Sequence, residues 1–101
     1  MFIIYLWDKD RGESITSLKD FTGNENFLIT SDSYKYPLLS ELSNCDMELF
    51  SDRQLASLRG EIESLMEEQS LDQSIYDYLS SVIDLNFHAE SNNKSILFSP
   101  F

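Results

Sequence analysis

Two stretches in the second half of the chain place apolar residues at the three- and four-residue steps of one helix face. The first covers residues 52–69, and the second begins near Asp72. A break of two or three residues between them predicts two helices packed side by side in opposite directions. Ser51-Asp52-Arg53-Gln54 has the spacing of a capping box, with Phe50 at the staple position, and Ser70 or Asp72 is expected to cap the second helix. The apolar positions are Leu55, Leu58, Ile62, Leu65 and Met66 in the first helix, and Ile75, Leu79, Val82, Ile83 and Phe87 in the second.

Short apolar runs elsewhere predict strands. Residues 2–7 are β-branched, aromatic or Leu without polar alternation, as in a buried central strand, and the turn residues 8–13 end it. Residues 27–30 are expected to form a second strand. Residues 46–50 are expected to form a short edge strand, and residues 95–99 a last strand that Pro100 stops.

Two further segments are less regular. Residues 14–21 fit either a short amphipathic turn or a strand paired back on the first one. Residues 36–42 contain Pro37, which disfavours a central strand, and are expected to lie on the core as an irregular segment. The whole pattern predicts an α+β fold: a small mixed or antiparallel sheet with an antiparallel helix pair packed on one side.

Length and composition set the broad class. A chain of 101 residues has room for one core, so residues 1–101 are expected to form a single domain. The single Cys45 excludes an intramolecular disulfide framework and favours a reducing compartment. The apolar N-terminus lacks a basic leader and reaches Asp8 too soon for a signal peptide, and no run approaches the ~20 residues of a membrane span. We therefore expect a cytoplasmic protein with no membrane partner.

The charge is concentrated in one third of the sequence. Between Gly60 and Asn93 there are eight carboxylates and no Lys or Arg, which accounts for -8 of the net charge of -11. Because these acids are interleaved with the helical apolar pattern, they predict a folded acidic face rather than a disordered tail. Such a face would attract a positively charged partner and repel nucleic acid and anionic membranes.

The spacing of the acids favours an interface over a merely solvated surface. Glu63/Glu67 and Glu61/Glu68 lie on neighbouring helical turns with no basic residue between them, an arrangement that lowers helix stability. A cationic partner would recover that loss. Tyr76 and Tyr78 lie among the acids, where each could either join the interface or pack against the neighbouring helix. The expected interface consists of Glu61, Glu63, Glu67, Glu68, Asp72, Tyr76, Asp77 and Asp84.

Residues suited to catalysis or metal binding are few. The lone His88 is expected to be a surface or packing residue near a helix end, and Cys45 a buried or half-buried small hydrophobe. Asp8-x-Asp10-x-Gly12 does not match a calcium loop, since Gly12 stands one position early and Lys19 replaces the twelfth-position Glu, so it is expected to be a tight turn. The sequence therefore predicts a protein that is not an enzyme and needs no cofactor or metal.

One set of segments, spread over most of the chain, resembles a known family. These segments are an apolar strand ending in an Asp and Gly turn, a central motif, and a short aromatic strand at the end. They comprise Leu6-Trp7-Asp8 to Gly12, Tyr36-Pro37-Leu38-Leu39, Phe50, Gln54, Leu58, Glu61-Ile62, Leu65 and Ile96-Leu97-Phe98. This pattern resembles small bacterial proteins of toxin–immunity loci, including those that protect cells from contact-delivered toxins. The resemblance implies a small, acidic, cytoplasmic protein that binds one cognate toxin, often a basic nuclease, and covers its active site or substrate surface.

Charge and resemblance together predict an immunity protein that neutralises a basic toxin domain, with a nuclease as the expected toxin. The acidic face would lie where the toxin expects a phosphate backbone, and the protein itself would not bind nucleic acid. It is expected to be a monomer or a weak dimer. The alternative is a nucleic-acid-mimicking inhibitor or adaptor that acts on a DNA- or RNA-binding protein.

Overall fold

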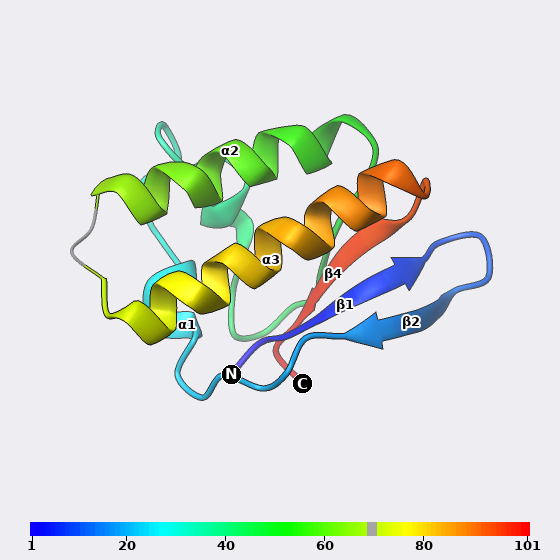
Figure 1. The fold of residues 1–101 in the computed structure, drawn as a ribbon, viewed down its shortest axis with the longest axis horizontal. Coiled ribbons are helices and arrows are strands. Elements are labelled where there is room, and N and C mark those ends of the chain that lie inside the picture. Colours follow the sequence, from blue (N-terminus) through cyan, green and yellow to red (C-terminus); the bar gives the residue numbers. More distant parts are fainter. Residues whose placement is uncertain (69–70) are drawn as a thin grey trace.

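The computed structural model describes residues 1–68 and 71–101 and contains one sheet and two long helices (Figure 1). The elements in chain order are β1 (Ile3–Asp8), β2 (Glu13–Ser17), α1 (Glu25–Leu28), the 3-10 helix η1 (Leu39–Glu41), β3 (Glu48–Phe50), α2 (Arg53–Glu68), α3 (Gln73–Ser91) and β4 (Ser95–Ser99).

All neighbouring strands of the sheet are antiparallel, in the order β2-β1-β4-β3. The apolar strand β1 lies between β2 and β4, as predicted for residues 2–7. Residues 13–17 pair back on β1, so the second of the two alternatives for residues 14–21 is confirmed. The predicted edge strand near residue 48 and the last strand before Pro100 are also confirmed.

The two long helices lie side by side, run in opposite directions and cover one face of the sheet (Figure 1). The predicted α+β fold with an antiparallel helix pair is therefore confirmed. The first helix ends at Glu68, while the predicted end at Gln69 and the alternative cap Ser70 lie outside the described residues. Asp72 occupies the N-cap position of α3, but no side-chain hydrogen bond completes that cap.

The capping box at the start of α2 is only half formed. Gln54 Oε1 accepts a hydrogen bond of 3.2 Å from the backbone N–H of Ser51. The Ser51 hydroxyl instead lies 2.7 Å from the hydroxyl of Ser95, which links the start of the helix to β4. Part of the predicted cap is thus used to join the helix layer to the sheet.

The core lies between the sheet and the helices. Alternate residues of β1 point toward the helices, and Phe98 of β4 makes edge-to-face contacts with Phe2 and Phe50. The helices contribute the predicted apolar stripe, in which Ile75 and Ile83 are partly buried. The fully or nearly fully buried core residues include Phe2, Ile4, Leu6, Leu28, Leu39, Leu42, Phe50, Leu55, Leu58, Ile62, Leu65, Leu79, Val82, Ala89, Ile96 and Phe98.

Residues 27–30, predicted to be a strand, instead include the end of the short helix α1, so this prediction is wrong. Asn24 fixes the segment: its buried amide bonds to the backbone N–H and C=O of Phe2 at 2.7 and 2.8 Å and to the Tyr78 hydroxyl at 2.9 Å. From this anchor one helical turn directs Phe27 and Leu28 into the core. An apolar run of four residues is too short for its periodicity to separate helix from strand.

Residues 36–42 form turns and the 3-10 helix η1, and they lie on the core as predicted, with Tyr36, Leu39 and Leu42 buried.

The apolar stripe of α3 differs from the prediction at one position: Phe87 is 48% exposed. Asn86 is buried instead, and its amide donates a 2.9 Å hydrogen bond to the carbonyl of Leu55. Within the described residues, every helix is too short or too polar to cross a membrane.

Candidate partner-binding surface

The acids of α2 point to two different sides of the helix. Glu61 and Glu68 are seven residues apart and face the segment around residues 35–39. Glu63 and Glu67 are four residues apart and line a groove shared with α3. The predicted single acidic face is therefore divided by the helix itself.

Glu61 is not available to a partner, which corrects its assignment to the interface. It is only 7% exposed. Its Oε1 accepts hydrogen bonds of 3.0 Å from the backbone N–H groups of Leu38 and Leu39, and Oε2 lies 3.1 Å from the same Leu38 N–H. The irregular segment cannot pair these N–H groups within a regular element, and the buried carboxylate supplies their acceptors.

Glu68 is engaged by the same segment. Its carboxylate forms an ion pair with Lys35 and accepts a 2.9 Å hydrogen bond from the Tyr36 hydroxyl. The hydrogen bonds from Lys35 and then Tyr36 hold the pKa of Glu68 below its ordinary value. Burial, followed by the Glu68 hydrogen bond, raises the pKa of Tyr36 to about 12. Glu61 and Glu68 are therefore not the unrelieved pair of like charges that their spacing suggested.

The groove between α2 and α3 combines acids with apolar side chains. It has a volume of ≈ 350 Å³ and is lined by Glu63, Met66, Glu67, Tyr76 and Ile83. Tyr76 is 46% exposed, whereas Tyr78 is buried against Phe21 and is a packing residue. Within the described part of the chain, no Lys or Arg forms a salt bridge with the two groove carboxylates. Three of the predicted interface residues thus come together here. We call this surface the helix groove.

A polar cluster lies further along the same helix pair, and the sequence reasoning missed it. The Arg59 guanidinium lies 4.1 Å from the centre of the Phe87 ring and 2.9 Å from Asn86 Oδ1. The same nitrogen lies 3.3 Å from a carboxylate oxygen of Glu90, so Glu90, like Glu68, has a basic partner. Arg59 immediately precedes the base-free stretch that begins at Gly60. This position in the sequence was the one feature that could have suggested a basic residue close to these acids.

The remaining predicted acids lie on α3. Asp77 is exposed and accepts a 2.8 Å hydrogen bond from the Gln73 amide one turn earlier. Asp84, seven residues later, is also exposed, and Asp72 is exposed at the N-terminus of the helix. Six of the seven predicted acids are therefore exposed: Glu68 is bound to Lys35 and Tyr36, and two of the other five lie in the helix groove.

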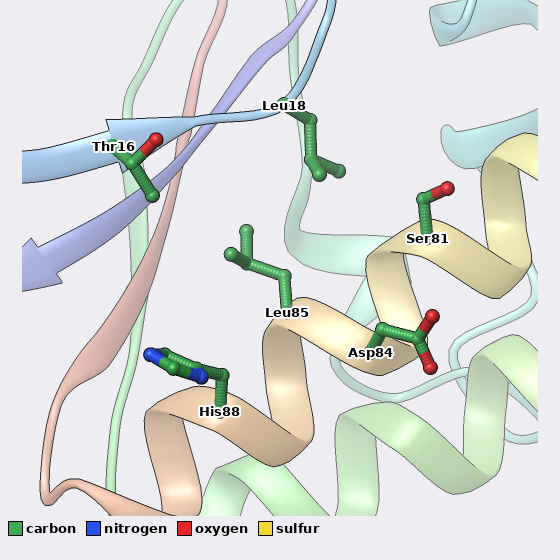
Figure 2. Close-up of a pocket in the computed structure, with 6 residues that line it drawn as sticks. All are labelled: Thr16, Leu18, Ser81, Asp84, Leu85 and His88. Atoms are coloured by element: carbon green, nitrogen blue, oxygen red, sulfur yellow. The ribbon is translucent and has the colours of Figure 1, made fainter.

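A second hollow separates α3 from β2, and Figure 2 shows its lining. Its volume is ≈ 400 Å³, and its walls are formed by Thr16, Leu18, Ser81, Asp84, Leu85 and His88. Leu18 and Leu85 point toward each other across it, while the Asp84 carboxylate points away from the His88 ring (Figure 2). The Ser81 hydroxyl donates to the carbonyl of Asp77 in its own helix. Ser, His and Asp are thus neighbours here without forming a nucleophile–base pair.

The other candidate chemical residues have structural explanations. Asp8 Oδ1 accepts hydrogen bonds from the backbone N–H groups of Asp10 and Arg11, and Gly12 has a positive φ of 67°, which confirms the predicted tight turn. Desolvation raises the pKa of Asp8, but the Arg11 hydrogen bond and the nearby Lys94 outweigh it and hold the pKa below its ordinary value. Among the described residues, no group of three metal-ligating side chains is arranged to hold an ion.

The predictions for the exposure of His88 and Cys45 have different outcomes. His88 is exposed in the last turn of α3, as predicted for a surface residue near a helix end. Cys45 is exposed, so its prediction as a buried or half-buried residue is wrong. It lies in the polar stretch before β3. There the Ser43 hydroxyl accepts hydrogen bonds from the backbone N–H groups of Cys45 and Asp46, and these bonds form an exposed turn.

Neither a protein-family model, nor a curated protein sequence, nor a solved structure gives a significant match to this chain.

Proposed function

We propose that the chain is an immunity protein that binds and neutralises a basic toxin domain through the helix groove. The observation that carries the proposal is the composition of that groove, in which Glu63 and Glu67 stand beside the half-exposed ring of Tyr76. Carboxylates without basic partners attract Lys and Arg, and an exposed aromatic gives the same contact an apolar centre.

Charge would guide the encounter. Seven of the eight carboxylates between residues 60 and 93 are exposed, six of them on α2 and α3, and the net charge of the chain is -11. The field of such a surface raises the association rate of a basic partner and opposes binding to nucleic acid. A nuclease would meet carboxylates where it normally meets phosphates.

The apolar part of the groove would make the complex long-lived. Met66 and Ile83 are partly buried and line the groove together with Tyr76, so a partner side chain entering the groove would displace water from all three. Binding energy at interfaces is concentrated in such central aromatic contacts, while rim charges mainly set the association rate.

The resemblance to proteins of toxin–immunity loci supports the same function and implies a cytoplasmic protein. In this proposal the chain acts by steric and electrostatic cover. No residue of the chain needs to perform chemistry, which agrees with the structural roles of Asp8 and Ser81.

The test is co-expression with the C-terminal domain of the protein encoded immediately upstream, scored as bacterial growth. The wild-type chain should restore growth, and a Glu63→Lys/Glu67→Lys variant should not. A matched control, Asp10→Lys/Asp20→Lys, changes the net charge equally at exposed positions outside the helix layer and should still protect. Failure of the wild-type chain to protect against that domain, or full protection by the groove variant, would contradict the proposal.

A further inference from the structure

The sheet has a second face that the helix layer does not cover. The register places Tyr5 opposite Leu97 and Leu97 opposite Leu49, so these three side chains lie on one side of three adjacent strands. Tyr5 and Trp7 share this side, and their rings make an edge-to-face contact with centroids 6.5 Å apart. On β2 the register shifts: Thr16 pairs with Leu6 and Ser14 pairs with Trp7, so Ile15 between them is the extra residue of a bulge and does not pack against the core.

This face is apolar and separate from the core. Leu97 is buried, yet neither it nor Tyr5, Trp7 or Leu49 belongs to the cluster of side chains packed between the sheet and the helices. Leu49 is 40% exposed and Ile15 is 50% exposed. Large apolar side chains that are exposed together across several strands mark a surface that another protein covers. We call it the open sheet face.

The open sheet face carries no charge. Among the described residues that strand register and alternation assign to it, none is acidic or basic. They are Ile3, Tyr5, Trp7, Ser14, Ser17, Leu49, Ser95, Leu97 and Ser99, and the bulge residue Ile15 beside them is also uncharged. This composition contrasts with the helix layer, where the acids of residues 60–93 lie. A basic partner would therefore gain electrostatic attraction at the helices and none at this face.

We propose that the open sheet face binds a second copy of the same chain, forming a symmetric dimer of sheet on sheet. A neutral apolar surface is best matched by another neutral apolar surface, and a twofold axis brings the same residues of both copies together. The two sheets would lie ~10 Å apart, with the aromatic pair Tyr5 and Trp7 near the centre. Both acidic helix layers would then lie on the outside, where repulsion between the two net charges of -11 is weakest.

The size of the face sets the strength of the dimer. Four strands spaced ~4.8 Å apart and a six-residue central strand rising ~3.3 Å per residue give a footprint of roughly 20 by 20 Å. That is small beside the ~800 Å² that each partner contributes to a standard interface. The dimer should therefore be weak and should dissociate readily on dilution. The helix groove stays accessible in it, so the dimer goes beyond the proposed function.

The experiment is sedimentation velocity on the full chain from low-micromolar to near-millimolar concentration, with tryptophan emission recorded in parallel. Trp7 is the only tryptophan, so its emission reports directly on this face. The proposal expects a monomer–dimer equilibrium, with a red shift of the emission on dilution. A chain that stays monomeric at the highest concentration contradicts the proposed dimer. That conclusion holds even if a different protein is later found to shield Trp7.

Two substitutions with a matched control locate the interface. Leu49→Glu and Ile15→Glu should each raise the dissociation constant of the dimer by about tenfold or more, because an unpaired carboxylate would be buried between the sheets. Both sites are exposed in the single chain, and circular dichroism should show the variants folded. Tyr76→Glu makes a comparable change in the helix groove and should leave the dimer intact. If Tyr76→Glu dissociates it and the sheet variants do not, the proposed face is wrong, whatever the outcome of toxin binding.

Discussion

Glu61 Oε1 accepts a 3.0 Å hydrogen bond from the backbone N–H of Leu39. The two residues are 22 positions apart, and the bond connects the middle of α2 to the start of η1. A carboxylate that looks like part of an acidic surface in the sequence is therefore the attachment point of an irregular segment. The segment from residue 36 to residue 42 owes its place on the core to this bond as well as to its apolar side chains.

Replacing Glu61 by Ala should lower the free energy of unfolding by about 2 kcal/mol or more, because two buried N–H groups would lose charged acceptors. Glu63→Ala removes an exposed carboxylate two residues away and should change stability by no more than about 0.5 kcal/mol. Urea denaturation of both variants measures the difference. Equal effects would show that the Glu61 hydrogen bonds are not important for stability.

Tyr36 should make stability fall at high pH. Its pKa is raised from 10.0 to about 12 in the folded protein, so unfolding releases a proton more readily above pH 10. The Tyr36 contribution is complete below pH 10 and is lost as the pH rises from 10 toward 12. Tyr36→Phe should flatten this part of the curve of unfolding free energy against pH, while Tyr34→Phe, at a fully exposed ring, should not. Identical alkaline slopes in both variants would contradict the assignment.

Glu68 should act at the opposite end of the pH range. Its folded pKa lies below the ordinary value of 4.5, so its stabilising contribution is present above pH 4.5 and is lost as the pH falls through the folded pKa. Glu68→Gln should reduce the acid-side loss of stability, and Lys35→Met should reduce it in the same direction, because the Lys35 ion pair lowers that pKa. Denaturation midpoints between pH 6 and pH 2 would measure both changes relative to the wild-type chain. An unchanged acid slope in both variants would show that the ion pair does not form in solution.

The interface between helices and sheet can be tested at its centre. Leu58 and Leu79 are fully buried, and truncating either to Ala should destabilise the protein by about 2–5 kcal/mol, through lost burial and the cavity that remains. Met47→Ala, at a half-exposed site, is the control and should cost less than about 1 kcal/mol. Chemical denaturation that showed less than half a kcal/mol for both leucines would contradict the helix assignments.

The parts of the fold that the sequence predicts are those with long or strongly apolar patterns. Helical spacing continues over four or more turns in each long helix, and the runs at residues 2–7 and 95–99 are unmistakably apolar. Residues 27–30 were misassigned because their helical turn depends on the bonds that Asn24 makes to Phe2 and Tyr78. Those partners lie 22 and 54 residues away along the chain, so the local sequence pattern cannot predict these hydrogen bonds.

The candidate site was predicted in part for a similar reason. Glu63, Glu67 and Tyr76 are exposed by helical geometry alone, since they lie away from the apolar stripes. Glu61 and Glu68 are occupied by Leu38, Leu39, Lys35 and Tyr36, which only the tertiary fold brings near. One local signal was present: Glu61 follows Leu58 by three residues and precedes Leu65 by four, which places it beside the buried stripe.

The last prediction concerns the strength of toxin binding by the helix groove. Association with the basic toxin domain should slow markedly as salt rises from low to physiological levels, where the screening length falls to about 8 Å, while dissociation changes little. Glu63→Lys/Glu67→Lys should reduce the association rate, and adding Asp77→Lys should reduce it further. Tyr76→Ala should instead raise the dissociation rate, because it removes the apolar contact and keeps the charges. Surface plasmon resonance with an inactive toxin domain separates the two rates. If the charge-reversed protein stays folded and binds as before, the interface lies elsewhere, and residues 31–46 are the next segment to test.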